Sequence, residues 1–136
     1  MASIFTKIIN REIPGYIVAE DVNNIAILDI NPLVQGHTLV IPKNETDYYF
    51  DLSDEEYESL NRFSKKLAKA IKSVIPCLRI GVAVVGLEVP HTHIHLIPLN
   101  SMGDINFNRP KLQLTNEEFG NICKKINNAF LAMSES

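Results

Sequence analysis

Apolar residues recur at helical spacing in two long runs of the chain, residues 57–74 and 119–133. Steps of three or four between apolar positions place them on one face of an amphipathic helix. Each run follows a capping box, Ser53 to Glu56 before the first and Thr115 to Glu118 before the second, in which a hydroxyl and a glutamate satisfy free backbone amides. The pattern therefore predicts one long helix, closed before Pro76, and a C-terminal helix.

The strand pattern is shorter and comes in neighbouring pairs. Stretches of β-branched and apolar residues bounded by Gly, Pro, Asn or Asp are typical of strands. Because few helices separate them, they favour an α+β fold, an antiparallel sheet of about five strands with helices packed on it. We expect a single domain over residues 1–136, whose last part, residues 100–136, is a loop and the C-terminal helix. The predicted strands are residues 16–20, 25–30, 37–41, 78–85 and 91–97, the last two apolar enough to be central, and a short helix is expected at residues 3–10.

Composition narrows the class of protein. The net charge of −3 at pH 7 gives no support for nucleic-acid binding, which usually needs a basic face. The apolar stretches fall short of the ~20 residues that span a bilayer, and no charged leader precedes an apolar run at the N-terminus. Cys77 and Cys123 lack a Cys-x-x-Cys spacing, which favours two free, buried thiols over a disulfide. We therefore expect a cytoplasmic protein with no nucleic-acid or membrane partner.

Three of the four histidines alternate in one predicted strand, at His91, His93 and His95. A strand would place their imidazoles on one face, successive ones roughly 6.5–7 Å apart. A neutral imidazole whose proton is held by a carbonyl presents a bare nitrogen that can attack phosphorus. We expect His93, the central member, to be the nucleophile and its two neighbours to support it. His37 opens another apolar strand and could join them across the sheet.

Two other interpretations of the row compete with this one. A single histidine on a strand face is usually structural, but three at period two are harder to explain in that way. A zinc site is the stronger rival, because three histidines are an established catalytic zinc set. No cysteine and no Asp/Glu cluster lies beside the row, so we expect no metal; a zinc-dependent hydrolase stays open as the alternative.

The row resembles the signature of the histidine triad family, which repeats a histidine and a hydrophobic residue three times before two further hydrophobics. The segment 3–14 is similar to the N-terminal opening of the same family, and the segments 26–32 and 36–43 are similar to its next conserved region. These segments occur in the expected order and span about residues 3–97. They are most similar to the Hint-like branch of nucleotide-binding phosphoramidases and nucleotidyl hydrolases.

The resemblance implies a homodimer that binds a purine nucleotide such as AMP and needs no cofactor. It implies that His93 attacks the α-phosphorus to form a nucleotidyl-histidine, with His95 and His37 around the phosphate. The main chain at His91 would orient the nucleophile, and Asp29 would bind the ribose hydroxyls. The residues that match the base pocket are Ile4, Phe5, Ile8, Ile27 and Ile30.

One segment departs from the family pattern. The family usually has an amide side chain and a Gly-rich loop before the triad, whereas residues 81–90 are shorter and more apolar. Glu88 stands where a hydroxyl that contacts phosphate is often found, and a carboxylate there would repel phosphate unless protonated or turned away. Glu88 is therefore a candidate for binding the leaving amine. The same departure keeps open a nucleotide-binding or adaptor protein with little turnover.

Overall fold

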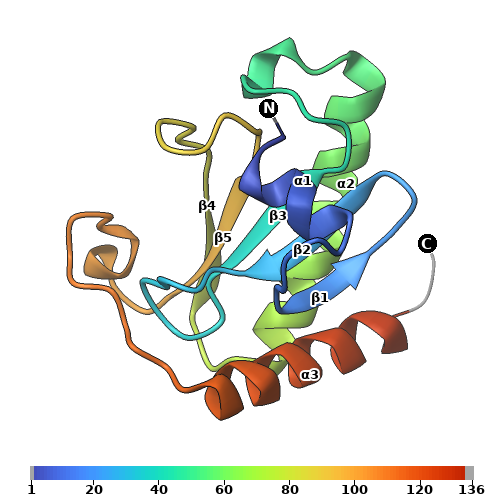
Figure 1. The fold of residues 1–136 in the computed structure, drawn as a ribbon. Coiled ribbons are helices and arrows are strands. Elements are labelled where there is room, and N and C mark those ends of the chain that lie inside the picture. Colours follow the sequence, from blue (N-terminus) through green and yellow to red (C-terminus); the bar gives the residue numbers. More distant parts are fainter. Residues whose placement is uncertain (1, 134–136) are drawn as a thin grey trace.

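The computed structural model describes residues 2–133, which form a five-stranded sheet with helices on both faces (Figure 1). Residues 1 and 134–136, the ends of the predicted domain, lie outside the described residues. In chain order the elements are α1 (Ile4–Ile9), β1 (Ile17–Glu20), β2 (Asn24–Leu28), β3 (Thr38–Pro42), the 3-10 turn η1 (Tyr49–Asp51), α2 (Asp54–Val74), β4 (Arg79–Ala83), β5 (Ile94–Leu99), the 3-10 turn η2 (Met102–Ile105) and α3 (Asn116–Ala132).

The strand order in the sheet is β1-β2-β3-β5-β4, and all neighbours are antiparallel. The predicted α+β class and the number of strands are confirmed. Pairing between β3 and β5 sets Leu39 opposite His95, which brings the histidine row beside the strand that follows His37. The sheet thus joins two segments that are far apart in the sequence.

Alternation along the strands divides the apolar residues between the two faces of the sheet. Figure 1 shows α1 in front of the sheet and α2 on the opposite face, with α3 along its lower end. Because Ile94 and Leu96 point toward α2 and α3, the histidines at odd positions point toward α1. The strand residues packed on the α1 side are Ile25, Ile27, Leu39 and Ile41.

Both predicted capping boxes are present. The Ser53 hydroxyl accepts a hydrogen bond from the Glu56 amide, and the Thr115 hydroxyl accepts one from the Glu118 amide. The apolar faces of α2 and α3 are buried as predicted over most of their length. Tyr57 is the exception: it lies in the first turn of α2, is 40% exposed, and packs against Tyr49.

Two predictions about the strands were wrong. β4 is an edge strand, because it comes last in the strand order and no strand of the described residues pairs with its outer side. Val82 in this strand is 64% exposed. β5 begins only at Ile94, so His91 and His93 lie in the loop segment just before the strand. A short apolar stretch indicates a strand but does not tell a central strand from an edge strand.

Other expectations concern the loop, the thiols and the membrane. The loop predicted at the start of residues 100–136 contains the turn η2. Cys77 and Cys123 are free thiols, but both are half-buried and not fully buried. Among the described residues, no helix is both long and apolar enough to cross a bilayer.

Candidate active site

Four buried histidines lie near the junction of β3 and β5, and three of their rings are in contact. The ring centroids of His93 and His95 are 5.0 Å apart, and those of His37 and His95 are 5.2 Å apart. The His91 ring is turned away toward the N-terminus of α1, where its Nδ1 lies 2.7 Å from Ser3 Oγ. The structure therefore joins three of the predicted site residues directly and places the fourth behind them.

The tautomer of His93 follows from its partner. Its Nδ1 lies 2.8 Å from the main-chain oxygen of His91, and a carbonyl oxygen can only accept a hydrogen bond. Nδ1 therefore carries the proton, and Nε2 keeps a free lone pair. The two groups that form this bond are two residues apart in the sequence.

A second chain of hydrogen bonds fixes the tautomers of the other two rings. The Leu33 amide donates to His37 Nδ1 at 3.0 Å, so the proton of His37 is on Nε2. That Nε2 lies 2.9 Å from His95 Nδ1, to which it donates. His95 must then carry its own proton on Nε2. The Leu33 amide thus determines, through His37, that His95 Nε2 is a hydrogen-bond donor.

Both rings are held neutral by their surroundings. Burial lowers the pKa of His37 from 6.5 to about 3, and repulsion between protonated rings of His37 and His95 adds to the effect. Burial lowers the pKa of His95 from 6.5 to about 4, and repulsion between protonated rings of His95 and His93 adds to it. At neutral pH the His95 Nε2–H is therefore a neutral donor.

Asp29 lies just after β2 on the same face of the sheet as the histidines. Its Oδ1 accepts a hydrogen bond from the Asn31 amide at 2.9 Å, and its Oδ2 is 3.6 Å from His37 Nε2. Burial raises the pKa of Asp29, and the nearby Glu88 carboxylate adds to that rise. The Asn31 amide and the positive charge of Lys111 act in the opposite direction. The acid predicted to bind a ribose is thus next to the histidines.

Phe107 is a site residue that the sequence did not reveal. It lies in the loop after η2, and its ring meets His95 edge-on at a centroid distance of 4.9 Å and His37 at 6.4 Å. The Leu112 amide donates to the Pro32 carbonyl at 2.8 Å and fastens this loop over the site. A lone phenylalanine in a polar loop gave no signal of this contact.

The residues predicted to line a base pocket fall into two groups. Phe5, Ile8 and Ile27 are buried in the smaller apolar cluster between α1 and the sheet. Ile4 is 50% exposed and Ile30 is 63% exposed, so these two side chains offer free apolar surface. The structure therefore divides this predicted set into core residues and surface residues.

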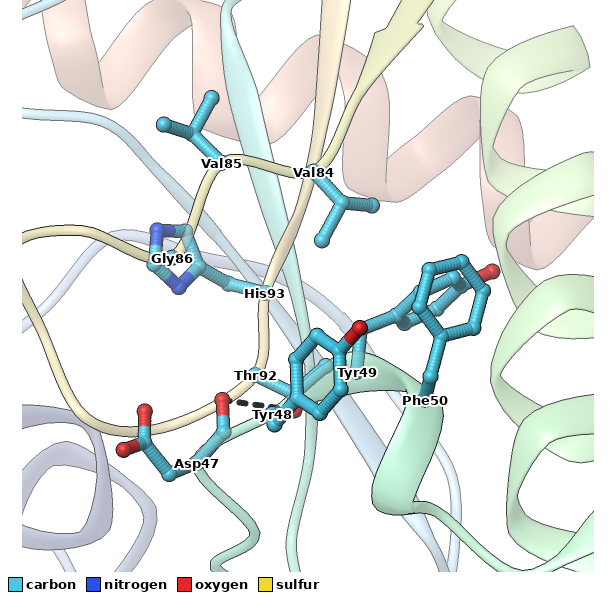
Figure 2. Close-up of a pocket in the computed structure, with 9 residues that line it drawn as sticks. All are labelled: Asp47, Tyr48, Tyr49, Phe50, Val84, Val85, Gly86, Thr92 and His93. Carbon is cyan, nitrogen blue, oxygen red and sulfur yellow. Dashed lines mark hydrogen bonds between the residues drawn. The ribbon is translucent and has the colours of Figure 1, made fainter.

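A cavity of about 210 Å³ lies beside His93 (Figure 2). Figure 2 shows its walls coming from two segments, with Thr92 and His93 between them. The Thr92 hydroxyl ties its own segment to the first wall by donating to the carbonyls of Thr46 at 2.7 Å and Asp47 at 3.3 Å. The other residues that line the cavity are Asp47, Tyr48, Tyr49, Phe50, Val84, Val85 and Gly86.

Asp29, His37 and His95 are the residues best placed to hold a metal ion, because one donor atom of each lies within 4.8 Å of the others. His37 Nε2 and His95 Nδ1, however, are 2.9 Å apart and joined by a hydrogen bond. Two nitrogens bound to one tetrahedral zinc at about 2.0 Å would be roughly 3.3 Å apart, with no proton between them. A metal would therefore have to break the hydrogen bond that fixes the His95 donor.

Comparison with known proteins gives the family. The sequence model of the HIT domain family matches residues 10–102. The chain belongs to the HIT family. Its fold is similar to that of a HIT-like protein from Bartonella henselae, described as involved in cell-cycle regulation and solved with an unknown ligand. The TM-score is 0.82 and the sequences are 34% identical, over 93% of this chain and 95% of that one.

Curated HIT relatives include proteins with and without a stated activity. An uncharacterized HIT-like protein of Borreliella burgdorferi is 39% identical over 131 residues, covering 90% of this chain and 94% of its own. The adenosine 5′-monophosphoramidase HNT1 of Saccharomyces cerevisiae is 40% identical over 98 residues, covering 71% of this chain and 62% of its own. The resemblance read from the sequence is confirmed.

Two aromatic residues of the site lie outside the segment that matches the HIT family model. Phe5 lies before the matched segment, and its ring meets His93 edge-on at 5.0 Å. Phe107 lies after it and covers His95 from the other end of the chain. Both aromatic neighbours of the HIT histidines are therefore supplied by segments outside the matched range.

Proposed function

We propose that this HIT protein is a nucleotidyl hydrolase, a phosphoramidase that cleaves purine nucleotide phosphoramidates or related nucleotidyl conjugates. The observation that carries the proposal is the His93 ring, whose Nδ1–H is held by the His91 carbonyl and whose Nε2 is therefore a free nucleophile. The yeast relative HNT1 is an adenosine 5′-monophosphoramidase, an enzyme of the same class of reaction.

The reaction takes place in two displacements. His93 Nε2 attacks the α-phosphorus, the bond from phosphorus to the leaving nitrogen breaks, and the amine departs after taking up a proton from solvent. The His95 Nε2–H donates to a non-bridging phosphate oxygen, where negative charge gathers, and His37 holds His95 in that tautomer. Water then attacks the nucleotidyl-histidine, and the nucleoside monophosphate leaves with His93 returned to its neutral form.

The two ends of the substrate lie on different sides of His93. Asp29 accepts hydrogen bonds from the ribose hydroxyls, and the exposed side chains of Ile4 and Ile30 contact the base. The cavity beside His93 takes the leaving group, because aromatic and valine side chains line it. Glu88 is exposed, lies outside the lining of this cavity and is near enough to Asp29 to raise its pKa; in this proposal it binds a cationic group on the departing amine.

A homodimer and a cytoplasmic location belong to the same proposal. The unpaired edge of β4 supports pairing with a second copy, because Val82 is 64% exposed and Leu87 is 88% exposed. The free thiols of Cys77 and Cys123 suit a reducing compartment.

Incubation with an adenosine phosphoramidate tests the proposal, with amine release followed in the presence and absence of a chelator. We expect chelator-resistant turnover by the wild type and none by His93→Ala, and intact-protein mass spectrometry of quenched samples should show adenylylation of the wild type alone. Glu58→Gln, which changes an exposed residue on α2, is the matched control and should retain full activity.

Two results would replace the proposal. AMP binding without amine release would indicate a nucleotide-binding protein. Loss of turnover with chelator, restored by zinc, would indicate the zinc-dependent hydrolase.

A further inference from the structure

A second polar cluster lies behind His91, at the N-terminus of α1. Ser3 is the N-cap of that helix, and its hydroxyl accepts a hydrogen bond from the Thr6 amide at 3.1 Å. The same hydroxyl lies 2.7 Å from His91 Nδ1. Ser3 is 7% exposed and His91 fully buried, so this contact is shielded from solvent.

The Pro42 carbonyl sets the direction of the hydrogen bonds that His91 makes. His91 Nε2 lies 2.7 Å from the Pro42 carbonyl oxygen, which can only accept, so Nε2 carries the proton. Nδ1 is then a bare acceptor, and the single hydroxyl proton of Ser3 must point at it. The Ser3 hydroxyl thus both caps α1 and donates a hydrogen bond to His91, whose tautomer the Pro42 carbonyl fixes.

Glu45 holds the other side of the cluster. Its Oε1 accepts the Ser3 amide at 2.8 Å and the Thr6 hydroxyl at 2.6 Å, and it lies 3.8 Å from His91 Nδ1. Because Thr6 gives its proton to Glu45, the Ser3 hydroxyl is left as the donor to His91. The Thr6 and Ser3 donors lower the pKa of Glu45 to about 2, so it is a carboxylate throughout the working range of pH.

The cluster is connected to the nucleophile by two routes. The His91 carbonyl accepts the Nδ1–H of His93 at 2.8 Å, so displacement of His91 would release the His93 tautomer. Phe5, in the first turn of α1, meets the His91 ring at a centroid distance of 5.8 Å and the His93 ring at 5.0 Å. A shift of the first turn of α1 would therefore move both histidines.

We propose that Glu45, acting with Ser3, is a positioning residue for His93: it fixes the N-terminus of α1 against His91 and thereby keeps the nucleophilic nitrogen of His93 bare and aimed. The proposal rests on the proposed function for its kinetic part. Glu45 touches neither the reacting phosphorus nor His93, and it acts through Ser3, Thr6 and His91.

Four variants separate this role from helix stability. Glu45→Ala removes both accepted hydrogen bonds, Glu45→Gln keeps an acceptor oxygen without the charge, and Thr6→Val deletes one donor with almost no change of shape. Glu58→Gln again serves as the exposed control. Each is compared by single-turnover adenylylation of His93, by KM for an adenosine phosphoramidate, and by long-range ¹H–¹⁵N spectra of the imidazoles.

We expect Glu45→Ala to lower the adenylylation rate roughly ten-fold with KM within about two-fold of wild type, since it changes alignment and not substrate contacts. The spectrum should change from the single Nδ1–H form of His93 to a mixture of tautomers. Glu45→Gln should recover most of the rate, and Thr6→Val should fall between the two.

The proposal is overturned if Glu45→Ala keeps the wild-type adenylylation rate and the single His93 tautomer. If Glu45→Ala does not fold, Thr6→Val and Glu45→Gln carry the same comparison, and wild-type rates and spectra in both would overturn it. The spectra need no turnover, so they test the positioning role even if the wild type releases no amine, which is failure of the proposed function alone.

Discussion

Mild acid should destabilise this protein strongly, because its histidines are buried in the neutral form. His37 is 2% exposed and His95 is 7% exposed, and their pKa values in the folded protein are about 3 and about 4. In the unfolded chain both have a pKa near 6.5. Their contribution to stability is therefore complete above pH 6.5 and is lost as the pH falls from 6.5 toward 4.

The size of the effect follows from the two pKa differences. At pH 5 the unfolded histidines are almost fully protonated while the folded ones are not, which lowers the free energy of unfolding by about 2 kcal/mol for each relative to pH 7. The two together give about 4 kcal/mol, a large share of the roughly 5–15 kcal/mol that stabilises a domain. The lowered pKa of His91 acts in the same direction. The raised pKa of Asp29 acts against it, so about 4 kcal/mol is the expected loss before that offset.

Urea unfolding followed by circular dichroism at pH 7.5, 7, 6, 5.5 and 5, at one protein concentration, measures this loss. All four histidines are buried, so no exposed imidazole contributes to the change. The control is His95→Gln, which keeps a neutral acceptor and should reduce the slope near pH 5 by about 1.4 kcal/mol per pH unit, the value for one proton.

A free energy of unfolding that is the same at pH 7 and pH 5 would refute the reasoning. It would mean that the rings bind protons in the folded state, and hence that the hydrogen-bond chain from Leu33 to His95 does not hold them neutral.

Three further predictions test other parts of the site. Val82→Asp, in the edge strand β4, should convert the proposed homodimer to a monomer in light scattering, because a buried charge opposes pairing of that edge; an unchanged mass at micromolar concentration would contradict this use of β4. Phe107→Ala should open His95 to water and move its pKa upward from about 4, as seen by NMR titration, whereas an unchanged pKa would show that Phe107 does not shield the ring. Asp29→Asn should weaken AMP binding roughly ten-fold in calorimetry but leave 2′,3′-dideoxy-AMP almost unaffected, and equal losses for both would remove the ribose role.

Local patterns determined the elements of this protein. The capping boxes at Ser53 and Thr115 and the apolar periodicity after each one located α2 and α3, because helix starts and buried helix faces depend on neighbours within one or two turns. The histidine spacing likewise pointed to the histidine cluster, since a spacing of two residues is itself a local pattern.

Contacts between distant segments were decided by the tertiary structure alone. The pairing of β3 with β5 set His37 against His95, the loop after β5 brought Phe107 over them, and the cap of α1 brought Ser3 to His91. None of these contacts leaves a periodic trace in the sequence, because each joins segments through strand order and loop path. The same reason explains why β4 was expected to be central: its apolar residues fix the tendency to form a strand, whereas only the sheet topology fixes which side remains unpaired.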